Sequence, residues 1–593
     1  MQSLQKLARM PIVLTVPAFS ILLVVVGIPT VLLFLSSLNA PAFSLANYQA
    51  FLAQQANVRV LFQTVEVSVV ATAICLIIGY PTAYLITSAS KRVRMALVVL
   101  VIIPYLTSAL ARTYVWIVIL GDRGLINNLL LDLGLISTPL SLIYNRGAVY
   151  IGMVHIMLPV MILPLISVMQ SIDKSLVAAA RSMGAHPFSA FWRVFFPLSL
   201  PGVRSGSLLV FVLCLGFYIT PAALGGLRDA MLSTFIASEV QSSFNMARTA
   251  TSAFILLGIA AVMLSVLGVD LSGTPGRGER PFRKSWWTPR GLFGALAHYL
   301  NERAIPYRAK RWTSTLYKAG GDSRWSSMLG TVFVVLVMFY LLFPGLVVII
   351  MSFSAGNYLQ FPPFVLSLRW YRSFFGDPSW TDAALTSVEI GVAVVILSTG
   401  VGTLAAFGLS RTRPRLRAFL TMILLAPITF PSIVVGIAAY LGLLNLGLTG
   451  TMTGIVMTHS IGAISYVVVI VSATLANFDQ RLELAAKSMQ AGPLRTFARV
   501  TLPMIWPGVI GGAVFAFIHS FDEVVKTSLV SGLSIRTLPL KMWENMRHDI
   551  DPTIAAVASL LVVLPLLWLV ALYGTWWRSR LQPQLTAPKP QTT

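Results

Sequence analysis

The chain has few acidic residues and almost no cysteine, and each shortage excludes a class of protein. Only 20 of its 593 residues are Asp or Glu, against 43 Lys and Arg. The two cysteines, Cys75 and Cys214, each lie inside an apolar run, which argues against a disulfide framework and a cysteine metal site. No His/Cys cluster has metal-ligand spacing, and no nucleophile–base pattern is visible. The sequence therefore predicts a protein that is not an enzyme and holds no metal.

The loop that cradles nucleotide phosphates is also missing. The pattern G-x-x-x-x-G-K-[ST] does not occur, and the sequence contains no Gly-Lys dipeptide. Any energy for its function must therefore come from elsewhere, and we predict that this chain itself binds no cofactor.

Apolar residues, in contrast, are abundant. Hydrophobic residues make up 56% of the chain and charged residues 11%, and the mean hydropathy is +0.81. A soluble core of this composition would expose too much apolar surface, so the class is integral membrane. About 20 apolar residues cross a bilayer core of ~30 Å, which predicts twelve spans in two sets of six. They lie near 12–36, 66–88, 96–119, 148–170, 205–224 and 250–269, and near 328–352, 387–409, 418–442, 454–476, 509–531 and 552–574.

The distribution of basic residues predicts the topology. With a cytoplasmic N-terminus, most Lys and Arg fall in the inner segments, as the positive-inside rule requires. The net charge of +23 then needs no nucleic acid as a partner, and both termini are predicted to be cytoplasmic. Six spans return the chain to its starting side, so we expect two parallel six-helix halves related by a pseudo-two-fold axis. The predicted fold is an all-α integral membrane protein.

The predicted domain boundaries follow from the spans. Residues 1–269 form the first six-span domain, 270–325 a basic cytoplasmic linker, 326–577 the second six-span domain and 578–593 a cytoplasmic tail. In the linker, Leu292, Leu296 and Leu300 share helical spacing. This segment has two open interpretations: a short helix on the inner membrane surface, or a flexible tether.

One segment occurs twice. Residues 179–203 (AARSMGAHPFSAFWRVFFPLSLPGV) and 485–509 (AAKSMQAGPLRTFARVTLPMIWPGV) align without a gap at an offset of 306, with 13 of 25 positions identical. Other stretches also pair: residues 64–84 align with 387–407, which matches Glu66 to Glu389. We interpret these paired segments as the result of an internal duplication.

Each copy predicts two short helices joined by a tight turn, on the cytoplasmic side between the fourth and fifth spans of its half. Gly184 suits the left-handed residue that ends a helix, and Pro187 and Pro493 suit the first turn of the next one. Pro197 and Pro503 are expected to end that second helix. We call the two units the knobs (residues 173–196 and 479–502). Two knobs about a pseudo-two-fold axis call for a partner with two-fold symmetry; amphipathic helices that only bind anionic lipid are the alternative.

The knobs resemble the EAA loop of ABC-importer permeases, which docks into a groove on the ATP-binding subunit. Ala178 stands where that motif usually has Glu. The second copy has Leu484 at this place, with Glu483 one residue earlier, and it has Gln490 in place of the motif's Gly. The resemblance implies that the coupling residues are Ala179, Ala180, Arg181, Gly184, Ala185, Pro187, Phe191, Ala485, Ala486, Lys487, Gln490, Ala491, Pro493 and Phe497.

The resemblance covers nearly the whole chain. RTYVWIVILGDRGLINNLL (112–130) is similar to one subunit of the spermidine/putrescine permease pair, and RTLPLKMWENMRHDIDPTIAAV (536–557) to the other. The family implies the type I importer permease fold in a bacterial inner membrane, here with both permease subunits fused. It also implies two ATP-binding subunits that carry ATP and Mg on the cytoplasmic side, an extracytoplasmic substrate-binding protein, and contact with membrane lipids.

The implied cargo is a polyamine, with ferric iron, thiamine, a phosphonate or an opine-like compound as other cargoes of the same class of permease. An ion-coupled secondary carrier is the alternative from a different class.

Charged residues within spans are the candidates for the substrate pathway. Asp522 and Glu523 form an acidic pair whose counterparts at the 306 offset are Gly216 and Phe217, so the fold does not require the charges. Two roles remain open for this acidic pair: a salt bridge with Lys526 inside the helix, or contact with a cationic substrate. Carboxylates and aromatic faces suit an organic cation, and the predicted pathway residues are Asp522, Glu523, Arg112, Tyr218, Phe217 and Phe521.

Other polar residues in the spans have a structural interpretation. His155, His459 and His519 are expected to form hydrogen bonds between helices. Glu66 and Glu389 begin equivalent spans, and for them the outer membrane interface and a functional contact are both open.

Overall fold

The computed structural model describes residues 11–567 except 40, 227, 243–244, 268–323, 357–360, 364, 533 and 549–550. The predicted linker helix and the C-terminal tail at 578–593 lie outside the described residues. The described part of the chain is helical, with one isolated antiparallel bridge between Ser354 and Leu366. The predicted all-α class is confirmed.

The first half contains the six spans and the first knob in chain order. Its helices are η1 (Pro11–Thr15), α2 (Val16–Leu22), η2 (Leu23–Gly27), α3 (Ile28–Ser37), α4 (Ala46–Ala53), α5 (Gln55–Ser88), α6 (Lys91–Leu106), α7 (Ala109–Leu120), α8 (Leu125–Asp132), α9 (Arg146–Ser171), α10 (Lys174–Ser182), α11 (Pro187–Ala190), η3 (Phe191–Phe195), α12 (Phe196–Leu215), α13 (Ile219–Leu224), α14 (Leu232–Ser242) and α15 (Met246–Leu267).

The second half repeats this order. Its helices are α18 (Arg324–Met351), α19 (Arg369–Gly376), α20 (Pro378–Ser410), α21 (Pro414–Thr429), α22 (Ser432–Asn445), α23 (Met452–Ala476), α24 (Arg481–Ser488), α25 (Pro493–Thr496), η4 (Phe497–Thr501), α26 (Leu502–Phe521), α27 (Val525–Val530) and α28 (Leu538–His548), followed by an apolar helix at Thr553–Leu567.

The helices account for the predicted spans. Among the described residues, ten helices are long and apolar enough to cross a bilayer, and α21 with α22, bent by 100°, makes an eleventh. The shorter helix Thr553–Leu567 stands at the place of the last predicted span. Each half therefore supplies six membrane-embedded segments, in the arrangement that the sequence predicted.

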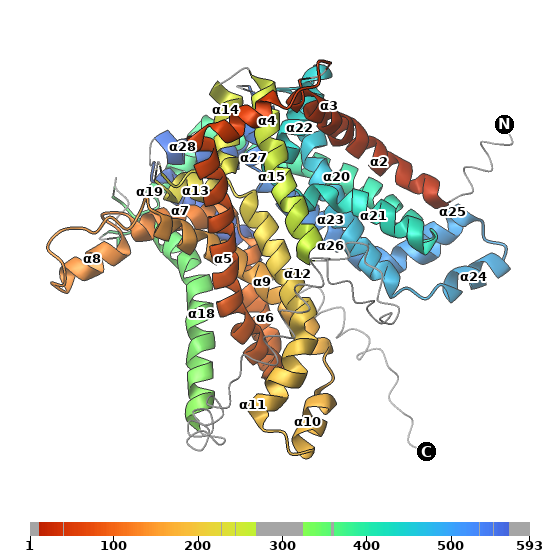
Figure 1. Ribbon diagram of the computed structural model, residues 1–593, viewed down its shortest axis with the longest axis horizontal. Coiled ribbons are helices and arrows are strands. Elements are labelled where there is room, and N and C mark those ends of the chain that lie inside the picture. Colours follow the sequence, from red (N-terminus) through yellow and green to blue (C-terminus); the bar gives the residue numbers. More distant parts are fainter. Residues whose placement is uncertain are drawn as a thin grey trace.

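The two halves interlock through their first spans. Each half has a core of three packed helices, α5, α9 and α12 in one and α20, α23 and α26 in the other. The first span of each half also packs on the opposite half: α3 contacts α22 as well as α15 of its own half, while α18 contacts α5, α6 and α7 (Figure 1). Tyr340 on α18 donates a hydrogen bond to the carbonyl of Ile151, with 2.7 Å between the oxygens. The chain is thus one packed unit, although its two halves are sequence repeats.

The fifth spans differ from the prediction. Each begins at the knob and runs as one helix, from Pro187 to Leu215 and from Pro493 to Phe521, so the predicted ends at Pro197 and Pro503 are wrong. A proline removes one backbone donor and crowds the carbonyl four residues earlier. In both halves that carbonyl lies in a π-helical turn, η3 or η4, and such a turn shifts the hydrogen bonds to wider spacing. The wider turn admits the proline without ending the helix.

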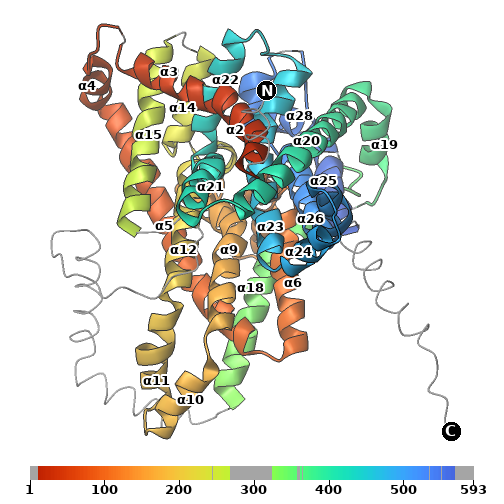
Figure 2. The same cartoon turned by 90° about the vertical axis from the view of Figure 1, so that its right-hand side faces the viewer.

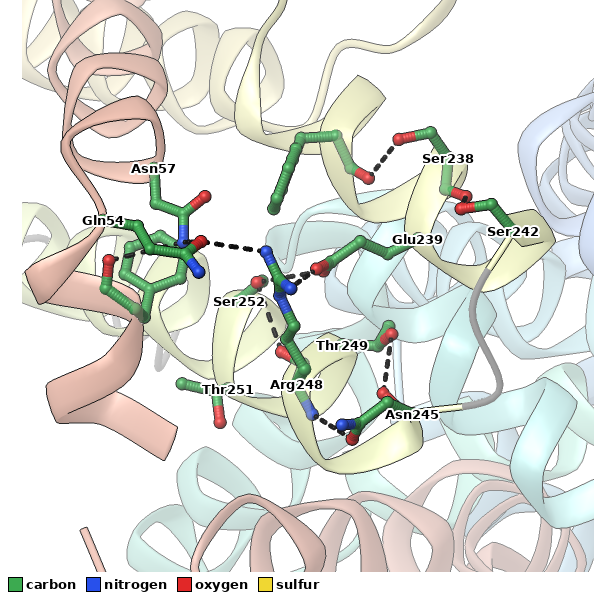
Figure 3. Close-up of polar contacts among 12 residues, drawn as sticks. Gln54, Asn57, Ser238, Glu239, Ser242, Asn245, Arg248, Thr249, Thr251 and Ser252 are labelled. Carbon is green, nitrogen blue, oxygen red and sulfur yellow. Dashed lines mark hydrogen bonds and ion pairs between the residues drawn. The ribbon is translucent and has the colours of Figure 1, made fainter. Parts of the chain in front are cut away.

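A polar cluster fixes the end of the first half that lies away from its knob (Figure 3). Arg248 on α15 lies 2.8 Å from the Glu239 carboxylate on α14 and donates to the Gln54 side chain at 3.0 Å. Ser252 donates to the same carboxylate at 3.2 Å. These contacts tie the start of α5 and helix α14 to the sixth span. Figure 2 shows α4 and α14 at the opposite end of the molecule from α10 and α11.

Candidate functional site

The two knobs have the same backbone, although one has glycine at the turn and the other has glutamine. Gly184 has φ +86° and Gln490 has φ +61°, so both occupy the left-handed region. Ala185 donates to the Ala180 carbonyl at 3.0 Å, and its counterpart Ala491 donates to Ala486 at the same distance. The replacement of glycine therefore leaves the turn closed, and the second knob holds a non-glycine residue in a conformation that side chains disfavour.

Each knob begins with an aspartate cap that we did not predict. Asp173 accepts a hydrogen bond from the amide of Ser175 at 2.9 Å, and its counterpart Asp479 accepts from Arg481 at 2.9 Å. The hydrogen bond from Ser175 lowers the pKa of the Asp173 carboxyl below its usual range, so this cap is intact at neutral pH. The sequence signal was present as an Asp just before the helix in both copies, one residue before α10 and two residues before α24.

The predicted coupling residues divide by exposure. Ala180 is buried, whereas Ala185, Pro187, Phe191, Ala486, Ala491 and Phe497 are partly buried, and Ala179, Arg181, Gly184, Ala485, Lys487, Gln490 and Pro493 are exposed. In each Ala-Ala pair the first alanine therefore faces outward and the second faces the interior of the knob. A surface that lets a partner backbone approach closely is consistent with the outward alanine.

Apolar side chains are exposed at matching positions of the two knobs. Met183 and Met489 are each 83% exposed, and Phe188 and Leu494 are 44% and 79% exposed. Leu176 and Leu482 form a third matching pair of exposed residues. Apolar surface repeated in this way is typical of a protein-binding site.

The knobs are anchored to their halves in part by the same contact. Phe191 meets Tyr84 of α5, with ring centroids 5.3 Å apart, and the counterpart Phe497 meets Phe407 of α20 at 4.9 Å. In both halves the π-helical turn of the knob therefore packs on the second span of that half. A displacement of either knob would be transmitted to that span.

The second knob has an additional, polar anchor. Glu483 lies 2.6 Å from the Arg411 guanidinium at the end of α20, and Thr501 donates to the same carboxylate oxygen at 2.7 Å. The counterparts of Glu483 and Thr501 in the first half are Val177 and Phe195, and Phe195 packs on Tyr84 at 5.2 Å. At these equivalent positions the first knob therefore has a further aromatic contact where the second knob has an ion pair.

Near the centre of the molecule, the third and fifth spans of each half are broken. The third spans break between α6 and α7 and between α21 and α22, and the fifth spans between α12 and α13 and between α26 and α27. The continuous helices predicted at 96–119, 205–224, 418–442 and 509–531 are therefore wrong at these points. Prolines explain the breaks of the third spans, because Pro104, Pro427 and Pro431 stand beside them. Irregular backbone at membrane depth is tolerated only where it is buried in protein or lines a cavity.

The break before α27 meets the break before α7 across the two halves. Asp522 accepts a hydrogen bond from the Ser108 hydroxyl at 2.5 Å and another from the Ala109 amide at 3.0 Å. Ala109 is the first residue of α7, so an acid of the second half caps a helix of the first half. Sequence reasoning could not pair groups more than 400 residues apart.

The equivalent contact on the other side of the pseudo-two-fold axis involves glycine. Gly216, the counterpart of Asp522, lies against the start of α22, where a Cβ would come within 2.9 Å of the Pro431 Cα. No side chain fits there without displacing the backbone. The two crossings between the halves are thus equivalent in position but opposite in chemistry, one a carboxylate cap and the other a bare backbone contact.

A cavity of about 160 Å³ lies at the second of these crossings, where Gly216, Pro431 and Ser432 are part of its lining. Residues from both halves line it, among them Phe217, Tyr466, His519, Glu523 and Lys526. Two of the predicted pathway residues, Phe217 and Glu523, therefore lie together. Tyr466 was not predicted; its only signal is its place seven residues after His459, on the same face of α23.

Inside this cavity the acidic residue has an ion-pair partner. The Lys526 ammonium contacts the Glu523 carboxylate, and both side chains are almost fully buried. Glu523 also accepts a hydrogen bond from the Lys526 amide at 3.0 Å. The salt bridge that the sequence left open is present, and its charges face the cavity.

The histidines differ in their contacts. His459 lies 2.9 Å from both the Ser520 and Thr527 hydroxyls, which ties α23 to α26 and α27, and His155 lies 3.2 Å from the Leu341 carbonyl. Both follow the expectation of bonds between helices. In the described part of the structure, Nε2 of His519 is buried without a hydrogen-bond partner, contrary to that expectation, because it packs against Gly462.

Among the described residues that line this cavity, the other predicted pathway residues are absent: Asp522, Arg112, Tyr218 and Phe521. Arg112 on α7 donates to the Thr107 carbonyl at 3.2 Å. Tyr218 packs on Trp543 at 5.5 Å between ring centroids, and Phe521 stacks on Phe517 at 5.4 Å. Glu66, for which two locations were open, is exposed and paired with Arg146 at 3.0 Å.

Comparison with known proteins identifies the family. The model of the family "Binding-protein-dependent transport system inner membrane component" matches twice, at residues 75–272 and 398–583. The spermidine/putrescine transport system permease protein PotB of Haemophilus influenzae is 38% identical over 187 residues, which are 32% of this chain and 65% of the relative. PotB of Escherichia coli is 36% identical over 194 residues, covering 33% of this chain and 70% of the relative.

A second kind of relative matches as well. The spermidine/putrescine transport system permease protein PotC of Haemophilus influenzae is 30% identical over 235 residues, 40% of this chain and 91% of the relative. Each relative therefore covers only part of the chain, as expected of two permease units in one polypeptide. With the family matched in both halves, around the repeated knobs, this chain belongs to the inner-membrane components of binding-protein-dependent transport systems.

Proposed function

We propose that this chain forms the complete membrane pathway of an ATP-driven polyamine importer, with permease units at 1–269 and 326–577 joined by a basic cytoplasmic linker. The observation that carries the proposal is the pair of knobs, which share a closed turn, an aspartate cap and exposed apolar positions. The cargo is inferred from the relatives, which are named for spermidine and putrescine transport.

Two ATP-binding subunits would dock on the two knobs at the cytoplasmic face. The exposed methionines and the outward alanines supply an adaptable apolar surface for a groove on each subunit. ATP-driven closure of these subunits would move the knobs, and the aromatic contacts of Phe191 and Phe497 pass that motion to α5 and α20. An extracytoplasmic binding protein would deliver the cargo at the opposite face, near α4 and α14.

The helix breaks are the place where such a motion would change access. Broken helices near the bilayer midplane are the usual construction of a transport site. Closing motions would separate or tighten the two crossings, one through Asp522 and one through Gly216, because each joins one half to the other. An organic cation that passes here loses water. The carboxylates and aromatic rings of the predicted pathway residues would offset that loss through charge-assisted hydrogen bonds and cation–π contacts.

Uptake measurements test the cargo. Vesicles that contain the full complex should accumulate labelled putrescine or spermidine with ATP. Asp522→Asn and Glu523→Gln should each lower uptake at least about tenfold, a loss on the scale of one charge-assisted hydrogen bond, while both variants still bind the ATP-binding subunit. Glu66→Gln is the matched control, because Glu66 is exposed and lies away from the cavity. Unchanged uptake in both test variants would remove the carboxylates from the pathway.

Single-cysteine labelling tests the knobs and the topology. Both native cysteines are buried, so Met183→Cys and Met489→Cys supply reporters with little background. We expect labelling in inside-out vesicles only, and protection when the ATP-binding subunit is present. Labelling from outside intact cells would show that the topology is wrong, and labelling that the bound subunit leaves unchanged would show that the knobs are not the docking site.

Substitutions at the outward alanines complete the test. Ala179→Arg and Ala485→Arg should release the ATP-binding subunit and leave the permease in the membrane. Ala180 is a poorer choice because it is buried within its knob.

The ion-coupled carrier alternative is not favoured, since the family transports with a binding protein. If the wild-type complex carries no polyamine, we would conclude that the chain has the same role in an importer for another cargo.

A further inference from the structure

The buried pair of Glu523 and Lys526 has a feature that a structural salt bridge does not need: it faces a cavity. Both residues line the space of about 160 Å³ at the helix breaks. A cavity of about 150 Å³ holds a molecule of the size of benzene, with six heavy atoms, so this space is large enough for an alkylammonium group of that size.

Lys526 stands at an unfavourable place for a cation. It is the second residue of α27, which begins at Val525, and a helix N-terminus carries partial positive charge. Glu523 compensates twice, since one of its oxygens accepts the Lys526 amide at 3.0 Å and the other contacts the ammonium. In the equivalent position of the first half, Thr220 replaces Lys526 and Phe217 replaces Glu523, so the fold itself does not depend on the pair.

Besides the ion pair, the cavity contains the imidazole of His519, which lacks a hydrogen bond at one nitrogen in the described part of the structure. Nε2 of His519 is buried and has no hydrogen-bond partner among the described residues, and His519 lines the same space as the ion pair. Tyr466 lies against its ring, with centroids 5.2 Å apart. An acid, an unsatisfied imidazole and aromatic faces form a site for an alkylammonium group, and a lysine side chain is itself an alkylammonium group on a four-carbon stem.

We infer that the Glu523 carboxylate is a binding site for the terminal ammonium of the substrate, and that Lys526 occupies it as a tethered substitute until a substrate amine exchanges with it. The inference rests on the proposed function for its cargo. Lys526 then sets the apparent affinity of the site for the substrate amine. Between transport cycles it also keeps the buried Glu523 carboxylate paired. A site filled by its own ligand nine-tenths of the time shows an apparent Kd about tenfold above the intrinsic value.

Thermal unfolding of the purified full complex tests the exchange, with putrescine and n-butylammonium as probes and tetramethylammonium at equal ionic strength as the control cation. Lys526→Met should unfold at a lower temperature than wild type without amine. Either primary amine should restore it, at concentrations about tenfold below those that affect wild type. The double variant Glu523→Gln/Lys526→Met should regain stability and lose the amine response. Lys541→Met, which removes a buried lysine outside the cavity, is the matched control and should respond to amines like wild type.

A variant that keeps the charge guards against a folding defect. Lys526→Arg retains the ion pair and binds a carboxylate more firmly through its planar fork, so half-saturation of putrescine uptake should rise several-fold. An equal amine response in Lys526→Met and in the double variant, or unchanged half-saturation in Lys526→Arg, overturns the inference and leaves the proposed function standing. If the wild type carries no polyamine, the proposed cargo fails, while a Glu523-dependent response to n-butylammonium still establishes the ammonium site.

Discussion

Removal of the Glu483 carboxylate should detach the second knob from α20 while the first knob stays in place. Glu483 is held at 2.6 Å by Arg411 and at 2.7 Å by Thr501. The two charged side chains are 10% and 17% exposed, so little water reaches the pair. Glu483→Ala removes both contacts and leaves the Arg411 guanidinium without its acid.

The magnitude follows from these contacts. Hydrogen bonds to a charged group contribute about 1.5–3 kcal/mol each, and breaking a fully buried ion pair from one side costs about 3–5 kcal/mol. Because the pair is partly exposed, its loss should fall at the low end of the second range. We therefore expect Glu483→Ala to destabilise the anchored position of the knob by about 3 kcal/mol. A change of ~3 kcal/mol is a factor of about 150 in the ratio of anchored to released knob.

Two assays would detect this change. Hydrogen exchange of the amides in α24 (Arg481–Ser488) should accelerate by about two orders of magnitude in Glu483→Ala, because the hydrogen bonds of this short helix open more often once it is released from α20. In proteoliposomes with the full complex, the amount of substrate imported per ATP hydrolysed should fall. Val177→Ala, at the equivalent place in the first knob, is the control and should leave α24 exchange unchanged.

The charge-exchanged variant Arg411→Glu/Glu483→Arg separates the ion pair from the loss of the side chain. It should recover part of both signals, since the pair can form again in the opposite sense. Exchange in α24 and the coupling ratio both at wild-type values in Glu483→Ala would refute the anchoring role, whatever the double variant does.

Three further predictions concern single positions. Gln490→Gly should stabilise the second knob by up to about 1 kcal/mol, because glycine adopts the observed φ of +61° without a steric penalty; slower hydrogen exchange in the turn is the measurement. Gly216→Ala should lower the unfolding temperature and transport together, at a cost of about 1–3 kcal/mol, since its Cβ would meet Pro431 at 2.9 Å; a fully active, equally stable variant would contradict the close crossing. Burial raises the pKa of the Glu239 carboxyl although Arg248 lies beside it. The folded pKa then exceeds the unfolded one, so this group adds stability at pH below its unfolded pKa and that contribution is lost as pH rises through the folded pKa. Stabilities of wild type and Glu239→Gln should therefore be most alike in the acidic range, where both side chains are neutral, and should diverge toward neutral pH as the variant becomes more stable relative to wild type; a difference in stability that does not change with pH would refute the raised pKa.

Local sequence was enough for the spans, the duplication and the knobs. Apolar runs of bilayer length and a gapless repeat are properties of neighbouring residues, and a turn such as Ala185 to Ala180 closes within six positions. The same locality explains the mistaken ends at Pro197 and Pro503. Proline was expected to stop a helix, but the π-helical turns η3 and η4 that admit it have no plain sequence signal.

The centre of the molecule was decided by tertiary structure. The sequence marked Asp522 and Glu523 as unusual but could not say that one caps α7 of the other half and that the other pairs with Lys526 beside a cavity. Ser108 and Asp522 are separated by 414 positions, and they meet because the two halves interlock about a pseudo-two-fold axis. Pattern analysis can show that a charge in a membrane span needs a partner. The partner itself is chosen by how the helices of both halves pack, since that packing alone sets which helix breaks face one another.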